Sequence, residues 1–121
     1  MKRWLIIGIL VGVILGVLFT FLINRHYSMV QSDAAYAYGL SLLEKNNKNE
    51  AIAVFNQAIG IDRKNYKPYI ALGKIYEAEG ETGLSLEFYK IARQLCTSDS
   101  AISRADKRFI EDRIKELSRG N

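Results

Sequence analysis

The sequence contains one cysteine, one histidine and one proline, which are Cys96, His26 and Pro68, and this scarcity excludes several classes of protein. A single cysteine cannot form a disulfide within the chain, and it leaves no Cys/His cluster for zinc. His26 directly follows a long apolar segment, so no Ser/His/Asp or Cys/His catalytic set can be assembled around it. No glycine-rich phosphate-binding motif is present either. We therefore expect a protein that is not an enzyme and has no cofactor or metal.

Cys96 has two interpretations that the sequence leaves open. The first is a small residue that packs in the protein interior, and the second is a cysteine that forms an intermolecular disulfide. We favour packing.

Excess charge is also scarce once the N-terminal segment is set aside. The chain has 17 basic and 13 acidic residues, a net charge of +4, but Lys2, Arg3 and Arg25 flank the apolar segment. From Asp33 onward, 14 basic residues face 13 acidic ones, a net charge of +1. Nucleic-acid binding requires a concentrated basic surface. We expect no nucleic-acid partner.

One long run without a charged residue occupies residues 4–23. At about 1.5 Å per residue, a helix of this length crosses a hydrocarbon core of roughly 30 Å. Trp4 and Tyr27 lie at its two ends, where aromatic belts form in membrane proteins. A cleaved signal peptide would have a shorter apolar core and a small-x-small cleavage site. We therefore favour a retained transmembrane signal anchor, with its flanks, over residues 1–27.

The charges on either side of this segment predict its orientation. Lys2 and Arg3 precede the span, whereas only Arg25 follows it closely. The positive-inside rule places the N-terminus in the cytoplasm and the rest of the chain on the extracytoplasmic side, which is periplasmic in a bacterium. The reverse orientation, with the rest of the chain in the cytosol, is the alternative.

Gly8, Gly12 and Gly16 recur at every fourth position within the apolar segment. On a helix they form one stripe, a small-xxx-small pattern that permits close approach of a second membrane helix. The pattern favours self-association, including a homodimer, or docking on a membrane helix of another protein. The alternative is that glycine is common in membrane helices.

Residues 32–65 and residues 66–99 are two copies of one 34-residue pattern. When the copies are aligned, Gly39 falls on Gly73, and Phe55 falls on Tyr89. This period is typical of helix-turn-helix repeats that stack on one another. Eight residues are expected to pack the helices together: Gly39, Ala51, Phe55, Ala58, Gly73, Tyr76, Tyr89 and Ala92.

These residues resemble the tetratricopeptide repeat family. The second copy carries Leu72-Gly73 and Tyr76 on its first helix, and the first copy carries the family's second-helix spacing. The chain departs from the family pattern where Arg63 and Thr97 replace its proline. The resemblance implies an all-α chain with a short solenoid of two repeats and a closing helix. The expected divisions are a signal anchor, a helical connector, two repeats and a C-terminal capping helix with a tail, at residues 1–27, 28–31, 32–65, 66–99 and 100–121.

Four helices after the first can be placed coarsely: Lys48–Ile61, Tyr66–Glu79, Thr82–Leu95 and Ser100–Ser118. Pro68 suits the first turn of its helix. Ser103 and Asp106 fit a capping box, which would make the last helix begin later. Between residues 24 and 46 there is no proline, so the membrane helix can continue into the first repeat helix.

The resemblance also implies a concave groove that is lined by the first helix of each repeat and holds an extended peptide or a helix. The matching groove residues are Tyr36, Leu40, Leu43, Lys67, Ile70, Lys74, Arg104 and Arg108. This groove would be apolar near the membrane and basic further along, which suits an acidic peptide. The alternative for its cations is ordinary solvated surface.

Two functions follow from these expectations. The first is a membrane-anchored adaptor or scaffold that presents the groove to protein partners at the bilayer surface. The second is a small accessory subunit that stabilises a larger membrane complex and docks through its glycine stripe. Solenoids of fewer than three repeats are marginally stable alone, so another subunit, a second copy or the membrane surface would complete the array. A membrane enzyme lacks the catalytic residues.

Overall fold

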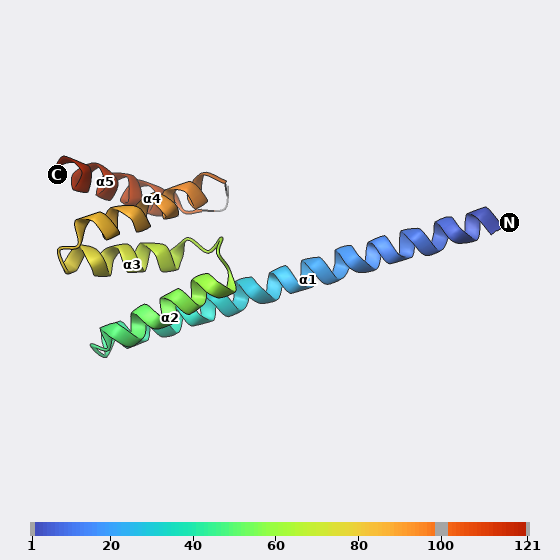
Figure 1. The fold of residues 1–121 in the computed structure, drawn as a ribbon, viewed down its shortest axis with the longest axis horizontal. Coiled ribbons are helices and arrows are strands. Elements are labelled where there is room, and N and C mark those ends of the chain that lie inside the picture. Colours follow the sequence, from blue (N-terminus) through green and yellow to red (C-terminus); the bar gives the residue numbers. More distant parts are fainter. Residues whose placement is uncertain (1, 99–101, 121) are drawn as a thin grey trace.

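The computed structural model describes residues 2–98 and 102–120, and the described residues form helices and turns without a strand (Figure 1). The helices are α1 (Lys2–Glu44), α2 (Lys48–Ile61), α3 (Lys67–Ala78), α4 (Thr82–Ser98) and α5 (Arg104–Arg119). Helices α2 to α5 stack beside the C-terminal half of α1, and the N-terminal half of α1 projects away from them. The predicted all-α class, a short solenoid that follows a long apolar helix, is confirmed.

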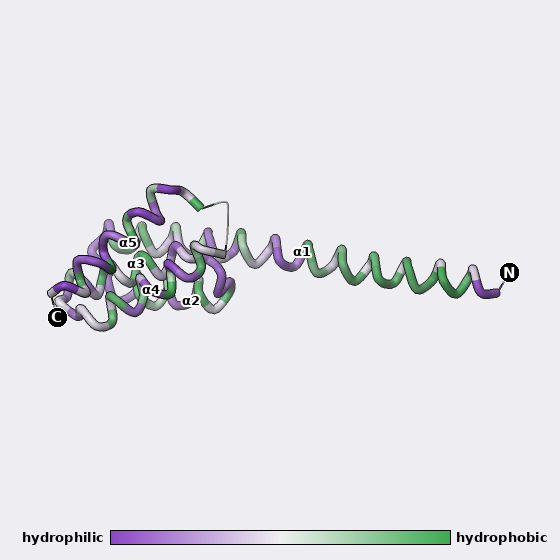
Figure 2. Tube along the Cα trace, turned by 90° about the horizontal axis from the view of Figure 1, so that it is seen from above, coloured by the Kyte–Doolittle hydropathy of each residue, from purple (hydrophilic) through white to green (hydrophobic). Residues whose placement is uncertain are grey.

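Helix α1 is one uninterrupted helix of 43 residues, about 64 Å long at 1.5 Å per residue. Side chains from residue 2 to residue 27 are all exposed, and the first fully buried side chain is Ser32. Figure 2 shows the projecting half as an almost continuous apolar segment. The proline-free stretch after residue 23 therefore continues the apolar helix into the first repeat helix, as predicted.

Each helical hairpin is closed by a ring that packs against a glycine. Helix α1 pairs with α2 through Gly39 and Phe55, and α3 pairs with α4 through Gly73 and Tyr89. A Cβ atom on Gly39 would lie 2.5 Å from Phe55 Cε1, and one on Gly73 would lie 2.8 Å from Tyr89 Cε1. Both rings are fully buried. The repeat period thus places the same close contact in both hairpins.

The other residues expected at this packing are placed nearby. Ala51, Ala58 and Ala92 are fully buried, and Tyr76 is partly buried. The Tyr76 ring stacks on that of Phe88, with 5.5 Å between ring centroids. Ser85, which stands where the first repeat has Ala51, is buried and donates a hydrogen bond of 2.9 Å to the Gly73 carbonyl.

The two hairpin turns have the same backbone geometry at equivalent positions of the two repeats. Asn46 has a φ of 64° and Gly80 a φ of 79°, so both lie in the left-handed region. The amides of Asn46 and Gly80 bond to the carbonyls of Leu43 and Glu77, both at 3.0 Å. Asparagine tolerates this conformation better than most residues other than glycine.

Helix α5 begins later than Ser100, where the sequence analysis placed its start. Residues 100 and 101 lie outside the described residues, and residues 102 and 103 are not helical. Ser103 is the N-cap, with a ψ of 134°, and its hydroxyl accepts a hydrogen bond from the Ala105 amide. This bond favours a helix start at Arg104, because the hydroxyl satisfies one of the amides that a helix start leaves unpaired.

The remaining helix boundaries agree closely with the prediction. Helix α2 has the predicted ends, α3 is one residue shorter at each end, and α4 continues three residues past Leu95. Pro68 lies in the first turn of α3, where its missing amide costs no intrahelical hydrogen bond.

Two apolar clusters hold the helices together. The first joins α1, α2 and α3 around Phe55 and Leu72, and the second joins α3, α4 and α5 around Tyr89 and Ile110. Cys96 is buried in the second cluster. Each helix therefore buries its apolar stripe against its neighbours, as stacked repeats require.

Candidate partner-binding groove

A pocket of about 420 Å³ lies between α1 and α3 and forms the first part of a groove. Its floor is mostly apolar, and charged residues stand at its edge. The lining residues are Tyr36, Leu40, Leu43, Asn46, Lys48, Ile70, Ala71, Lys74, Ile75, Ala78 and Glu79. The volume is within the usual range for binding pockets. We call this the α1–α3 pocket.

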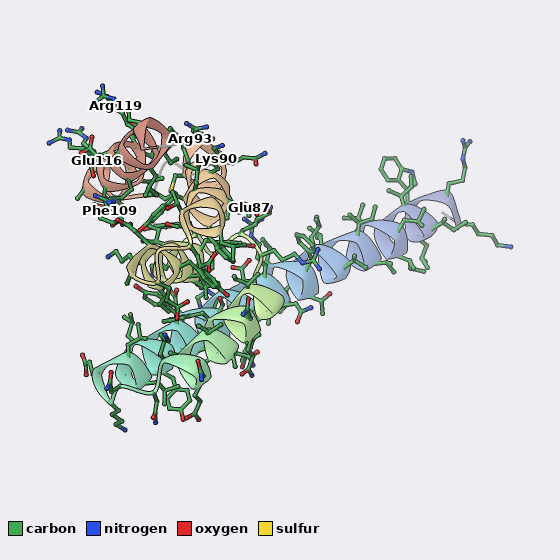
Figure 3. The ribbon with its side chains drawn as sticks, turned by 60° about the vertical axis from the view of Figure 1, so that its left-hand side comes forward. Glu87, Lys90, Arg93, Phe109, Glu116 and Arg119 are labelled. Atoms are coloured by element: carbon green, nitrogen blue, oxygen red, sulfur yellow. The ribbon has the colours of Figure 1, made fainter. Side chains whose placement is uncertain are left out.

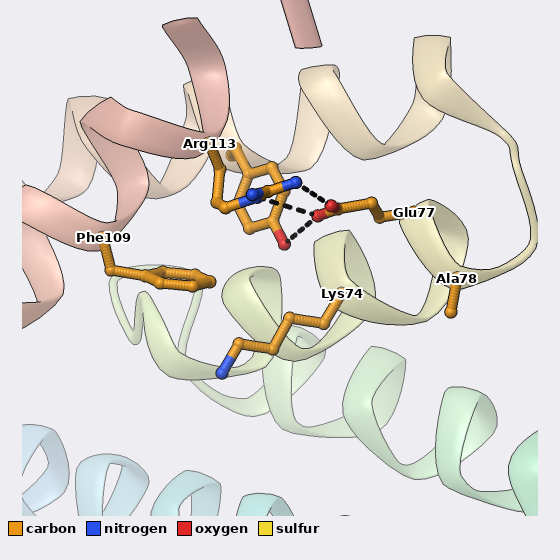
Figure 4. A pocket seen from close by; sticks show the side chains of 6 residues that line it. Lys74, Glu77, Ala78, Phe109 and Arg113 are labelled. Atoms are coloured by element: carbon orange, nitrogen blue, oxygen red, sulfur yellow. Dashed lines mark hydrogen bonds and ion pairs between the residues drawn. The ribbon is translucent and has the colours of Figure 1, made fainter. Parts of the chain in front are cut away.

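A second pocket, of about 400 Å³, continues the groove between α3 and α5 (Figure 4). Its lining residues are Lys74, Glu77, Ala78, Tyr89, Phe109 and Arg113. The two pockets share Lys74 and Ala78, so they adjoin along α3. Together they form one groove across the first helices of both repeats and the closing helix.

The glycine contacts explain why the groove exists at this place. Gly39 and Gly73 pack against rings of α2 and α4, and the groove residues one turn away on the same helices, such as Tyr36 and Ile70, lie beside these contacts. Tyr36 tilts against Phe55, with 5.9 Å between centroids, so one end of the groove rests on the first core cluster. The groove floor is therefore built on rigid, packed helices.

Glu77 organises the α3–α5 end of the groove. Tyr89 donates a hydrogen bond of 3.0 Å to Glu77 Oε2, and Arg113 Nε donates one of 3.2 Å to the same oxygen. Arg113 also pairs through Nη2 with Glu77 Oε1 and through Nη1 with Glu116. Figure 4 shows Arg113 and the carboxylate meeting at the groove wall.

This network changes the pKa of two of its members. Burial and the hydrogen bond to the Glu77 carboxylate raise the pKa of Tyr89 well above its usual value. The hydrogen bond to Glu77 also raises the pKa of Arg113. Both groups stay protonated over the physiological range, so the network fixes α5 against α3 and α4 rather than supplying an acid or a base.

Lys74 is the cation at the centre of the groove. Its ammonium lies 4.7 Å from the centroid of the Phe109 ring. Within residues 2–98 and 102–120 it makes no ion pair, whereas Lys48 is paired with Glu79. Lys74 can therefore meet an acidic group of a ligand without breaking an ion pair.

The eight groove residues named from the sequence do not all meet. Tyr36, Leu40, Leu43, Ile70 and Lys74 line the α1–α3 pocket together. Lys67 instead forms an ion pair with Asp33, at 3.1 Å. Arg104 and Arg108 are exposed and line neither of the two pockets.

The two α5 residues that do line the groove, Phe109 and Arg113, were not predicted from the sequence. Extrapolating the repeat register into the last helix selected Arg104 and Arg108, but α5 is a closing helix without a copy of the repeat pattern. The available signal was the i, i+4 spacing of Phe109 and Arg113 beside the buried Ile110 and Ile114.

Tyr36 and Tyr66 connect the groove electrostatically to Asp106 of α5. Tyr66 donates a hydrogen bond of 2.8 Å to Asp106, and burial together with this bond raises its pKa. Burial, followed by the charges of Asp106 and Asp33, raises the pKa of Tyr36.

No group of three or more His, Cys, Asp or Glu side chains within residues 2–98 and 102–120 is arranged to hold a metal ion.

Residues 32–65 match the family model of the tetratricopeptide repeat. The chain contains a tetratricopeptide repeat. The match covers α2 and the part of α1 that packs on it. No curated protein is similar enough to this chain to count as a match.

Two solved structures of a tetratricopeptide repeat domain protein from Salinibacter ruber are similar in fold. The crystal structure has a TM-score of 0.66 at 20% identity and covers 74% of this chain and 99% of that chain. The solution NMR structure has a TM-score of 0.65 at 20% identity and covers 74% of this chain and 89% of that chain. This likeness shows that the repeats have the tetratricopeptide fold. The family match over residues 32–65 suggests a protein–protein interaction role.

Proposed function

We propose that this chain is a membrane-anchored, non-catalytic adaptor or scaffold that holds a protein partner in its tetratricopeptide groove. The observation that carries the proposal is the apolar α1–α3 pocket, because it is built on the same helix that is long and apolar enough to cross a membrane. Exposed apolar side chains in such a groove are typical of a surface that a partner covers. The proposed divisions are those of the sequence analysis, from the anchor at residues 1–27 to the capping helix at 100–121.

The continuous α1 sets the distance between the bilayer and the groove. Tyr36 follows Ile23, the last residue of the apolar run, by about 20 Å of helix. In the proposed orientation the N-terminus is cytoplasmic, and the groove begins at about this height above the hydrocarbon core on the extracytoplasmic side. A rigid helix of this kind raises the local concentration of partners at the membrane.

The chemistry of the groove favours a partner segment with apolar side chains and one acidic group. Leu40, Leu43 and Ile70 offer an apolar surface, and Lys74 supplies the positive charge. The other cations at the groove, Lys48 and Arg113, are already paired with carboxylates. A preformed groove binds such a segment with little ordering cost on its own side.

Two matched leucine substitutions test the proposal. Leu40 is 38% exposed and lines the groove, whereas Leu84 is 44% exposed on α4 and lines neither pocket. We expect Leu40→Glu to remove partners captured by the tagged full-length chain from native membranes, because the carboxylate is incompatible with an apolar contact. Leu84→Glu should retain them. Equal capture by both variants would contradict groove binding.

The second candidate function is an accessory subunit or homodimer that docks through its membrane helix. Gly12 and Gly39 are separated by about seven and a half turns of helix. Because Gly39 faces α2, the glycine stripe is on the side of α1 opposite to α2. A Cβ on Gly8, Gly12 or Gly16 would meet nothing within 4 Å. This side can accept another membrane helix without displacing the repeats.

The effect of Gly12→Leu on native gels separates the two functions. A subunit should lose its assembly, because the leucine prevents close helix approach. Ile14→Leu, on the other side of the helix, is the control and should leave the assembly intact. An adaptor should keep its groove partners in both variants.

A further inference from the structure

The two ends of the repeat stack differ in position relative to the proposed membrane span. The turn between α2 and α3, the C-terminal end of α4 and the start of α5 lie toward the projecting half of α1 (Figures 1 and 2). The hairpin turns at Asn46 and Gly80 lie at the opposite end. We call these the near end and the far end. Dividing α2 to α5, and residues 24–44 of α1, at their midpoints assigns the described residues 24–34, 55–72, 91–98 and 102–111 to the near end.

The charges of the chain are divided unequally between these two ends. The described residues of the near end include eight basic and four acidic ones, a net charge of +4. The far end, from residue 35 onward, has seven basic and eight acidic residues, a net charge of −1. The small net charge of the whole repeat region therefore conceals a separation of charge along the direction of α1.

Most near-end cations are available to an external anion. Lys67 is paired with Asp33, but the other seven near-end cations make no ion pair within residues 2–98 and 102–120. They are Arg25, Arg63, Lys64, Arg93, Arg104, Lys107 and Arg108. All except the partly buried Lys107 are exposed, and Arg93 points away from the stack in Figure 3.

The distance from the bilayer brings these cations within reach of lipid headgroups. Asn65, in the α2–α3 turn, donates a hydrogen bond of 2.9 Å to Ser32, so this turn lies beside Ser32 of α1. Ser32 follows Ile23 by about 14 Å of helix. The headgroup layer occupies about 5–8 Å of this distance. The remaining gap is comparable to the Debye length of about 8–10 Å.

We propose that the near end of the repeat stack docks on anionic lipid headgroups, through the exposed cations of the α2–α3 turn and the first turns of α5. This inference rests on the proposed membrane anchoring and extends it. The docked pose holds the solenoid upright on the bilayer and keeps the acidic far end away from it.

Hydrogen exchange of the full-length chain in nanodiscs tests the docking. Discs of phosphatidylcholine alone are compared with discs that also contain phosphatidylglycerol. We expect amides of residues 61–67 and 102–108 to exchange more slowly in the anionic discs, and the difference to vanish at high salt. Each basic residue near an anionic surface favours the docked pose by roughly fivefold.

A pair of charge-reversed variants provides the control. Lys64→Glu with Arg104→Glu should remove the protection, because both side chains are exposed at the near end. Lys45→Glu with Lys115→Glu makes the same change in net charge at the far end and should retain it. Protection that is equal in both kinds of disc, or equal in both variants, overturns the docking.

Flotation with liposomes after a high-salt wash separates this inference from the anchoring on which it rests. A chain that floats with vesicles of either lipid composition is anchored, and the exchange experiment then decides the docking alone. A chain that stays out of the vesicle layer overturns the proposed anchoring and the docking together.

Discussion

The substitution Gly39→Ala tests the packing on which both the hairpins and the groove depend. The added methyl group would lie 2.5 Å from Phe55 Cε1 and 2.8 Å from Cδ1, well inside van der Waals contact. The Phe55 ring is fully buried, so it cannot move away without disturbing the first core cluster. Overpacking of this kind costs about 1–3 kcal/mol. Replacing glycine by alanine inside a helix returns about 0.5–1 kcal/mol.

The expected result is a net loss of roughly 1–2 kcal/mol in the free energy of unfolding. Gly60→Ala is the matched control, because Gly60 is also helical but a Cβ there meets nothing within 4 Å. That variant should gain stability from its helix propensity alone. Urea unfolding of the full-length chain in micelles, followed by circular dichroism, measures both. A Gly39→Ala variant that is as stable as Gly60→Ala would show that the Gly39–Phe55 contact does not limit the packing.

Three further predictions follow from the turns and from the Glu77 network. Asn46→Gly should raise the unfolding free energy by about 0.5–1 kcal/mol and Gly80→Ala should lower it by about 1 kcal/mol, because both residues have positive φ. Urea unfolding that shows a less stable Asn46→Gly variant or a more stable Gly80→Ala variant would contradict this. Since the pKa of Tyr89 is raised, its stabilisation is complete below pH 10 and is lost as the pH rises above 10. When the pH is raised from below 10 to about 11, the unfolding free energy of Tyr89→Phe should therefore fall by about 1.4 kcal/mol less than that of the original chain. Equal decreases in the two proteins would contradict this. Glu77→Gln should cost about 1–2 kcal/mol, and a double-mutant cycle with Arg113→Leu should show coupling of at least about 0.5 kcal/mol.

The fold could be predicted from the sequence because its information is local and repeated. The repeat period placed the same glycine–ring contact at Gly39 and at Gly73. Helix boundaries were close because turn residues and Pro68 mark them. The left-handed residue of the first turn was missed, although Asn46 is the counterpart of Gly80 in the repeat register. Asparagine occurs in several kinds of turn with different backbone angles, so its residue type alone does not indicate a positive φ.

The groove was predictable only where the repeat register applies. Tyr36, Leu40 and Ile70 lie on helices that follow the period, and they line one pocket. The closing helix α5 is tied to the repeats by contacts between distant residues, above all Glu77 with Arg113. Nothing in the local sequence of α5 specifies that partner, so its orientation needed the three-dimensional structure.

Site-specific photocrosslinking in native membranes tests whether the membrane-anchored groove binds a protein partner. A photoreactive residue at Leu40 lies in the groove, and the same residue at Leu84 lies outside both pockets. We expect a defined crosslinked protein from position 40, absent from position 84, in a membrane fraction that resists carbonate extraction. Identical crosslinks at both positions, or recovery of the chain in the soluble fraction, would contradict a membrane-anchored groove that binds a protein partner.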